Sequence, residues 1–141
     1  MSSQYCTFRL DSHLFGVPVE SVQEVLKQQE LTTVPQAPSV VSGLINLRGQ
    51  IITTLELRTR MGLPPRAPDE QGINVVVRTG EEVVSLLVDE IGDVLEPEPE
   101  SFEGLPETVP ATIRDVVTDV CKLDGHLMLV LDTERAVQVA D

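Results

Sequence analysis

The stretch that decides the fold is residues 43–57, GLINLRGQIITTLEL. Apolar runs lie on both sides of Arg48-Gly49, where glycine supplies the positive φ that a tight turn often needs. The same pattern recurs at residues 73–88 around Gly80-Glu81 and at residues 113–131 around Asp124-Gly125. We therefore predict β-hairpins at these three places.

The rest of the chain is also predicted to be mostly extended. Val, Ile and Thr together contribute 38 residues, and these β-branched types prefer strands. Further strands are predicted at residues 5–10, 14–19 and 91–95; the second of them either lies at a sheet edge or ends at Pro18, because proline cannot donate to a ladder. Two short helices are predicted, one from the capping box at residues 21–24 with Val22, Val25 and Leu26 buried, and one at residues 133–137.

A connector divides this pattern of short strands. Residues 61–72, MGLPPRAPDEQG, are rich in proline and glycine and indicate irregular structure. A chain of 141 residues forms one domain or two very small ones. Short strands on both sides of the connector predict two small barrels or sandwiches of about 50–60 residues each.

The charge of the chain argues against several kinds of partner. Its formal net charge is −13, so nucleic acids and anionic membranes would be repelled, and aromatic residues for base stacking make up only 3%. The charge is uneven: residues 1–66 carry five acidic and six basic residues, whereas residues 67–141 carry 18 and four. No run approaches the roughly 18 apolar residues of a membrane span. Two cysteines without a redox or zinc spacing fit a reducing, cytoplasmic compartment.

The sequence contains no catalytic or metal-binding motif of the common kinds. His13 and His126 fall in predicted turns, and Cys6 and Cys121 fall on predicted strands, where cysteine is a small buried hydrophobe. The ten acidic residues from Glu81 to Glu107 lack the spacing of a Ca²⁺ loop. Phosphate-binding glycine motifs are absent from the sequence. The sequence therefore predicts a binding protein, with no catalytic residue, no metal and no cofactor.

Three strings in order carry a resemblance: residues 22–25, residues 34–60 with the run Gly43 to Gly49, and residues 87–95. Together they resemble the bacterial chemotaxis coupling protein family, CheW, from about Tyr5 to Val137. The resemblance implies an all-β fold of two intertwined SH3-like five-stranded barrels with a few short helices. It implies one CheW-like domain over residues 1–141, with residues 14–66 in the first barrel and residues 4–11 plus 72–137 in the second.

The same resemblance implies a non-enzymatic adaptor in chemotaxis signal transduction. Its partners would be the cytoplasmic tip of a chemoreceptor (a methyl-accepting chemotaxis protein) and the regulatory domain of a CheA-type histidine kinase. The adaptor would be cytoplasmic, without membrane insertion, and recruited to membrane-associated receptor arrays. The surface that docks the kinase is left unassigned.

The resemblance also implies a receptor-binding groove. In the family, the position of Arg48 pairs with that of Glu24, and both lie beside the groove with the positions of Val22, Val25 and Gly43. An Arg fork can pair bidentately with a carboxylate, and an apolar groove beside it suits an amphipathic helix. The simpler alternatives are that Arg48 only lies at a hairpin tip in solvent and that Glu24 only caps a helix.

Val88 and Val94 are further expected receptor contacts, with burial in the core as their alternative. We also expect Arg48, Arg58 and Arg60 to be presented near the first hairpin, and the Glu81 to Glu107 acids to form a solvated face of the second barrel.

Two other functions remain open at this stage. One is an adaptor of the same fold in a chemosensory-like pathway for pilus motility or development. The other is a small β-barrel ligand-binding protein or enzyme that uses the carboxylates of the second half.

Overall fold

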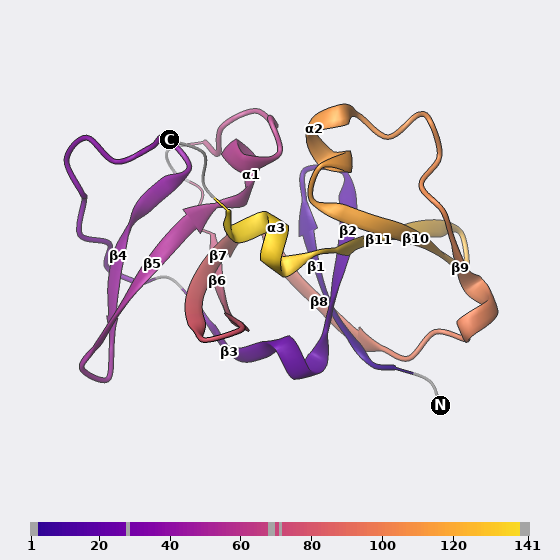
Figure 1. The fold of residues 1–141 in the computed structure, drawn as a ribbon, viewed down its shortest axis with the longest axis horizontal. Coiled ribbons are helices and arrows are strands. Elements are labelled where there is room, and N and C mark those ends of the chain that lie inside the picture. The colour runs from indigo at the N-terminus through magenta and orange to yellow at the C-terminus, as the bar shows by residue number, and fades with distance from the viewer. Residues whose placement is uncertain (1–2, 28, 68–69, 71, 139–141) are drawn as a thin grey trace.

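The computed structural model describes residues 3–27, 29–67, 70 and 72–138, and folds them mainly into two β-sheets that lie side by side (Figure 1). The six-stranded sheet has the order β8-β1-β2-β11-β10-β9, and the five-stranded sheet has the order β3-β6-β7-β5-β4. The strands are β1 Tyr5–Leu10, β2 His13–Pro18, β3 Val22–Leu26, β4 Val41–Leu47, β5 Gln50–Glu56, β6 Ile73–Thr79, β7 Glu82–Val88, β8 Glu90–Leu95, β9 Phe102–Glu103, β10 Val117–Leu123 and β11 His126–Leu131. The short helices are η1 Val19–Ser21, α1 Leu57–Arg60, η2 Pro99–Ser101, α2 Ala111–Arg114 and α3 Thr133–Val137.

The predicted hairpins are confirmed. β4 pairs with β5, β6 with β7, and β10 with β11, all antiparallel and with their tight turns at the predicted dipeptides. β2 ends at Pro18 as expected, although it lies inside its sheet, and the predicted helix at residues 133–137 is α3. The predicted strand at residues 113–123 starts later, because residues 111–114 form α2.

Each sheet is completed by a single parallel pair between segments far apart in the chain. β2 pairs with β11 in the six-stranded sheet, and β5 pairs with β7 in the five-stranded sheet. The fold is therefore all-β with intertwined halves, as predicted.

The predicted division of strands between the barrels is wrong. β2 was expected in the first barrel, but it pairs within the six-stranded sheet, next to β1 and β11. The β6–β7 hairpin was expected in the second barrel, but it lies in the five-stranded sheet, between β3 and β5. The reason is hydrogen bonding: β3 and β5 each gain a ladder partner from that hairpin, and an unpaired edge is costly. Residues 68–69 and 71 of the predicted connector lie outside the described residues.

The predicted helix at the capping box is also wrong. Residues 22–26 form β3, which pairs antiparallel with β6 and matches Val25 to Val75 and Leu26 to Asn74. A single capping signal is worth about 1 kcal/mol. The ladder satisfies the backbone groups of the whole segment, and its β-branched valines suit an extended chain.

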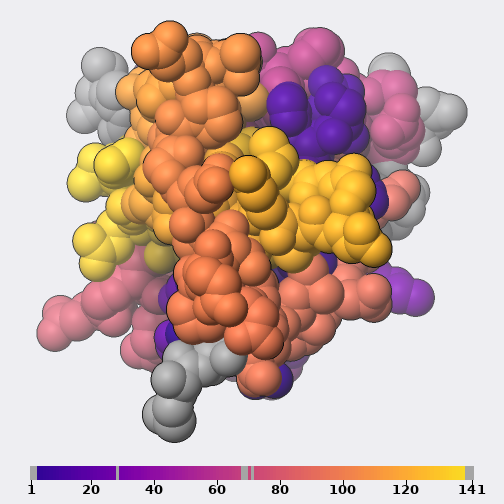
Figure 2. All heavy atoms as spheres, turned by 90° about the vertical axis from the view of Figure 1, so that its right-hand side faces the viewer, coloured from indigo at the N-terminus to yellow at the C-terminus, as the bar shows by residue number. Residues whose placement is uncertain are grey.

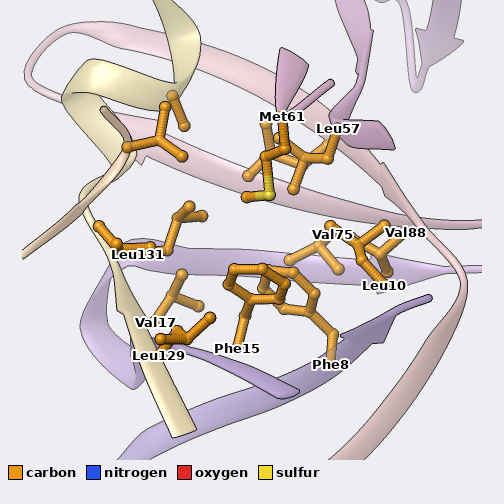
Figure 3. Packing of buried hydrophobic residues seen from close by; sticks show 14 of the residues in the cluster. Phe8, Leu10, Phe15, Val17, Leu57, Met61, Val75, Val88, Leu129 and Leu131 are labelled. Carbon is orange, nitrogen blue, oxygen red and sulfur yellow. The ribbon is translucent and has the colours of Figure 1, made fainter. Parts of the chain in front are cut away.

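The largest hydrophobic cluster lies between the two sheets. Phe8 and Phe15 of the six-stranded sheet stack with ring centroids 5.7 Å apart, and they face Val75 and Val88 of the five-stranded sheet (Figure 3). Ala136 of α3 belongs to the same cluster. Smaller clusters fill the other face of each sheet: one is formed by Leu14, Cys121, Met128 and Val130, and one by Ile45, Leu47, Ile52 and Val76. This central core fixes the two sheets to each other.

Candidate functional site

The tip of the β4–β5 hairpin has an unusual backbone. The last ladder pair is Leu47 with Gln50, so Arg48 and Gly49 form a two-residue loop, with φ of 52° and 86°. The amide of Gly49 donates to Asn46 Oδ1 at 3.0 Å. Positive φ at both positions is the type I′ pattern, which favours Asn or Gly over a long side chain at the first position. Arginine at this strained position is a reason to look for a function of its side chain.

The guanidinium of Arg48 forms a bidentate ion pair with Glu24 of β3. Arg48 Nη1 donates to Glu24 Oε1 at 3.0 Å, and Nη2 donates to Oε2. The hydrogen bond from Arg48 lowers the pKa of Glu24, and the same bond raises the pKa of Arg48. The pair predicted from the family resemblance is confirmed as a contact, and both groups stay charged at neutral pH.

This ion pair joins the two edges of the five-stranded sheet. β3 is the first strand in the sheet order and β4 is the last, so the pair helps to close the sheet into a barrel. The side chain of Arg48 is still 68% exposed. Because a guanidinium carries five N–H donors, those not used by Glu24 face solvent and can bind an acceptor on a partner. A barrel-closing role and a binding role are therefore compatible.

The apolar residues of β3 divide between surface and core. Val25 is 43% exposed and follows Glu24 in the strand. Val22 is half-buried and packs against the central core. Of the predicted receptor residues, the structure brings Glu24 and Arg48 into contact, and we call this pair the Arg48–Glu24 site. Val25 is paired with Val75 whereas Glu24 is paired with Val76, so the side chains of Val25 and Glu24 leave opposite faces of β3.

Gly43 lies in the interior. The segment before β4 approaches it closely, with mutual backbone hydrogen bonds of 2.9 Å between Thr32 and Leu44. A Cβ on Gly43 would lie 2.7 Å from the carbonyl oxygen of Thr32, and its φ is +156°. The glycine is needed so that residues 31–32 can lie against β4, and its place beside a receptor groove stays a prediction.

The two valines expected beside the groove lie in different places. Val88 is fully buried in the central core, so the expectation of a receptor contact is wrong and the core alternative is correct. Val94 is 56% exposed, but it lies on β8, the edge strand of the other sheet, opposite Cys6. Val94 is thus a surface residue that no described contact joins to the Arg48–Glu24 site.

Sequence reasoning missed an ionic cluster at the junction of the sheets. Arg58 donates twice to Asp89, through Nε at 2.9 Å and through Nη2 at 2.6 Å, and the backbone amide of Asp11 donates to Asp89 at 2.8 Å. Arg66 pairs with Asp89 and also with Glu56, at 2.9 Å from the latter. The expectations of an exposed Arg58 and a solvated Asp89 are therefore wrong. The partners are 31 residues apart, and no local pattern could have revealed them.

Asp89 titrates in this cluster. Burial raises the pKa of its carboxyl, but the hydrogen bonds from Arg58, Asp11 and Arg66 lower the pKa more, to about 2. The carboxylate is therefore a stable anion that holds α1, the connector and the β1–β2 turn together. The role of Asp89 is therefore to stabilise the fold.

The described part of the chain also contains histidines, cysteines and acidic residues outside these two places. Within it, no group of three or more His, Cys, Asp or Glu residues is arranged to hold a metal ion. Cys6 is half-buried, Cys121 is buried, and both are free thiols. None of the helices described is long and apolar enough to cross a membrane.

The fold and the site define a class of protein: a two-barrel β protein that presents binding surfaces. A family model for the CheW-like domain matches residues 4–141. The chain is similar to a probable chemotaxis protein CheW of Rhizobium etli, with 28% identity over 90% of this chain and 82% of the relative. It is also similar to the chemotaxis protein CheW of Klebsiella aerogenes, with 25% identity over 96% and 81%.

A solved structure agrees with these relatives. The scaffolding protein TtCheW from Thermoanaerobacter tengcongensis matches with a TM-score of 0.84 and 27% identity, over 93% of this chain and 89% of that one. The chain belongs to the CheW-like domain family. The predicted resemblance is thus confirmed, and a non-enzymatic chemotaxis adaptor is favoured over both the pilus or developmental adaptor and the ligand-binding or enzymatic barrel.

Proposed function

We propose that this adaptor couples a chemoreceptor to a CheA-type histidine kinase, and that it binds the cytoplasmic tip of the receptor through the Arg48–Glu24 site. The regulatory domain of the kinase binds a separate surface, and the receptors recruit the adaptor to membrane-associated arrays. The names of the relatives support the pathway. The observation that carries the proposed site is the exposed, bidentate Arg48–Glu24 pair.

The chemistry of the site suits an amphipathic receptor helix. Arg48 offers unused N–H donors to carboxylate or amide oxygens on the polar side of such a helix. Val25, the next residue of β3, is also exposed and offers an apolar contact on the other face of this edge strand. Glu24 holds the guanidinium in place, so little side-chain freedom is lost when the helix binds.

The direct test is the charge reversal Arg48→Glu. We expect it to weaken binding to a receptor signalling fragment at least about tenfold, because it removes the cation and places a second carboxylate beside Glu24. The measurement is a quantitative pull-down, with folding checked by circular dichroism. Arg78→Glu is the matched control, because Arg78 is exposed on β6 of the same sheet. Equal binding by a folded Arg48→Glu variant and the wild type would reject the site.

A charge swap separates a contact role from barrel closure. The double variant Glu24→Arg with Arg48→Glu restores an ion pair between the two edge strands. If the pair only closes the barrel, the swap restores receptor binding. We expect the thermal stability to recover and the binding to stay weak, because the cation then lies on β3 and not at the hairpin tip.

Coupling itself is tested by co-sedimentation with receptor membranes and kinase. We expect the wild type to bring the kinase into the pellet and to change its autophosphorylation. Arg48→Glu should reduce both effects without reducing binding to the kinase alone. No change in kinase recruitment or activity with the wild-type chain would contradict the proposed function as a whole.

A further inference from the structure

A cavity of about 500 Å³ lies at one end of the six-stranded sheet, on the face shown in Figure 2. Three segments form it: the β1–β2 turn, the β10–β11 turn and the segment of residues 106–113, which we call the strap. In Figure 2 these segments are indigo, amber and orange, and they meet on that face. A cavity of this volume is in the range of small-molecule sites.

The strap is held in place by its own hydrogen bonds. The amide of Val109 donates to the carbonyl of Pro106 at 3.2 Å, and the amide of Ile113 donates to that of Pro110 at 3.1 Å. The guanidinium of Arg114 also donates to the Pro106 carbonyl. The cavity is therefore already formed in the free protein, and a ligand would not have to order this wall.

The lining combines apolar walls with a few polar groups. Its apolar side chains include Leu14, Val109, Ile113 and Leu129. Its polar side chains come from both turns and from β1, and they are Arg9, Ser12, His13 and His126, with Thr108 from the strap. None of the described lining residues is acidic, although the chain as a whole has a net charge of −13. The described lining of this cavity therefore carries one permanent charge, that of Arg9.

Arg9 is the permanent cation of this lining, and its side chain is not neutralised. Glu90 lies opposite Arg9 in the β1–β8 ladder. Even so, the side chain of Arg9 makes no ion pair with any residue that the structure describes. A second cavity of about 450 Å³ shares Arg9, Leu14 and His126 with the first, and its own lining adds Asp93 and Asp124. The guanidinium fork of Arg9 can accept a carboxylate bidentately.

We propose that this cavity binds a small monocarboxylate with an apolar body. The carboxylate lies against Arg9, and the histidines and Ser12 offer further hydrogen bonds to it. The apolar body lies between the strap and Leu129. One guanidinium matches the single negative charge of one carboxylate. This site lies in the six-stranded sheet and is independent of the Arg48–Glu24 site.

Octanoate is the probe, and the full chain is titrated with it while amide shifts and thermal unfolding are recorded. We expect saturable amide shifts confined to the residues that line the cavity and their neighbours, and a rise in Tm with octanoate concentration. Arg9→Gln should weaken the binding about tenfold or more, because it removes a charge-assisted hydrogen bond. Arg78→Gln, at an exposed arginine of the other sheet, should bind like the wild type.

A second variant places a charge at the mouth of the cavity. Leu127 lines the cavity and is 44% exposed, so Leu127→Glu should fold and repel the carboxylate. The matched control is Ile51→Glu, at a 60% exposed position of the other sheet. Octanol and octylammonium are the chemical controls, and both should bind more weakly than octanoate.

Several results would overturn the proposal: no saturable shift with octanoate, equal binding of octanol, or equal affinity in Arg9→Gln and Arg78→Gln. Amide shifts that lie mainly away from the cavity lining would also overturn it. Receptor pull-down of Arg9→Gln should match the wild type. The proposed ligand site and the proposed receptor site can therefore be contradicted independently of each other.

Discussion

Gly43 shows how a close approach of two backbone segments can require a glycine. We expect Gly43→Ala to destabilise the fold by about 2 kcal/mol, since the new Cβ would meet the Thr32 carbonyl at 2.7 Å and the backbone has a positive φ. Urea unfolding measures the change. Gly104→Ala is the control, because a Cβ there meets nothing within 4 Å. Equal loss in both variants would contradict the argument from close approach.

At this scale the sequence was informative where a family pattern existed. The Arg48–Glu24 contact followed from the resemblance and is present in the structure. The backbone strain at Arg48 was not predictable, because an arginine at the first loop position carries no such signal. The burial of Val88 was left open by its sequence, since apolar residues next to a turn occur in both settings.

The ionic cluster at Asp89 should make the stability of the fold depend on pH. The pKa of Asp89 is about 2 in the fold, below the value of about 3.9 of an unfolded chain. A lowered pKa stabilises the fold above pH 4, and this stabilisation is lost as the pH falls from about 4 through 2. It amounts to about 2 kcal/mol. Acid unfolding followed by circular dichroism should show this loss.

The variant Asp89→Asn tests which group is responsible. It should be less stable than the wild type by about 3 kcal/mol at pH 7, because Arg58 and Arg66 lose their shared charged partner. Its stability should also depend less on pH between 4 and 2. Asp124→Asn, in an exposed hairpin turn, should change neither property. An unchanged acid profile in Asp89→Asn would assign the pH dependence to other carboxyls.

Elements were predictable where the signal was local. A turn dipeptide between two apolar runs is contained in a few residues, and the three hairpins were found from it. The segment 22–26 carried a local helix signal, yet it became β3 because β6 offered it a ladder. The ionic cluster depends on residues from segments that are far apart in the chain, so it could be seen only in the structure.

At the scale of the molecule, neither half of the chain should fold alone. The parallel pairs β2–β11 and β5–β7 draw each sheet from both sides of the connector. We expect fragments 1–66 and 73–141 to be unfolded separately and to form the native sheets when mixed. Circular dichroism and amide shift dispersion measure this. Cooperative unfolding of either fragment alone would contradict the interleaved topology.

The same parallel pairs explain why the barrels were assigned wrongly. Hairpins join neighbours in sequence, so a division at the proline-rich connector was the natural expectation. A parallel pair between strands far apart in the chain has no signal in the local sequence. Only the intertwining implied by the family resemblance pointed to it, and that resemblance did not say which strands cross over.

The central core between the sheets has a mechanical consequence. Bending one sheet against the other would have to separate Phe8 and Phe15 from Val75 and Val88, which are all buried there. Packed interiors resist such opening. We therefore expect the two sheets to move as one rigid body when a partner binds at the hairpin tip of Arg48, so that the exposed strand edge at Val94 moves together with that tip.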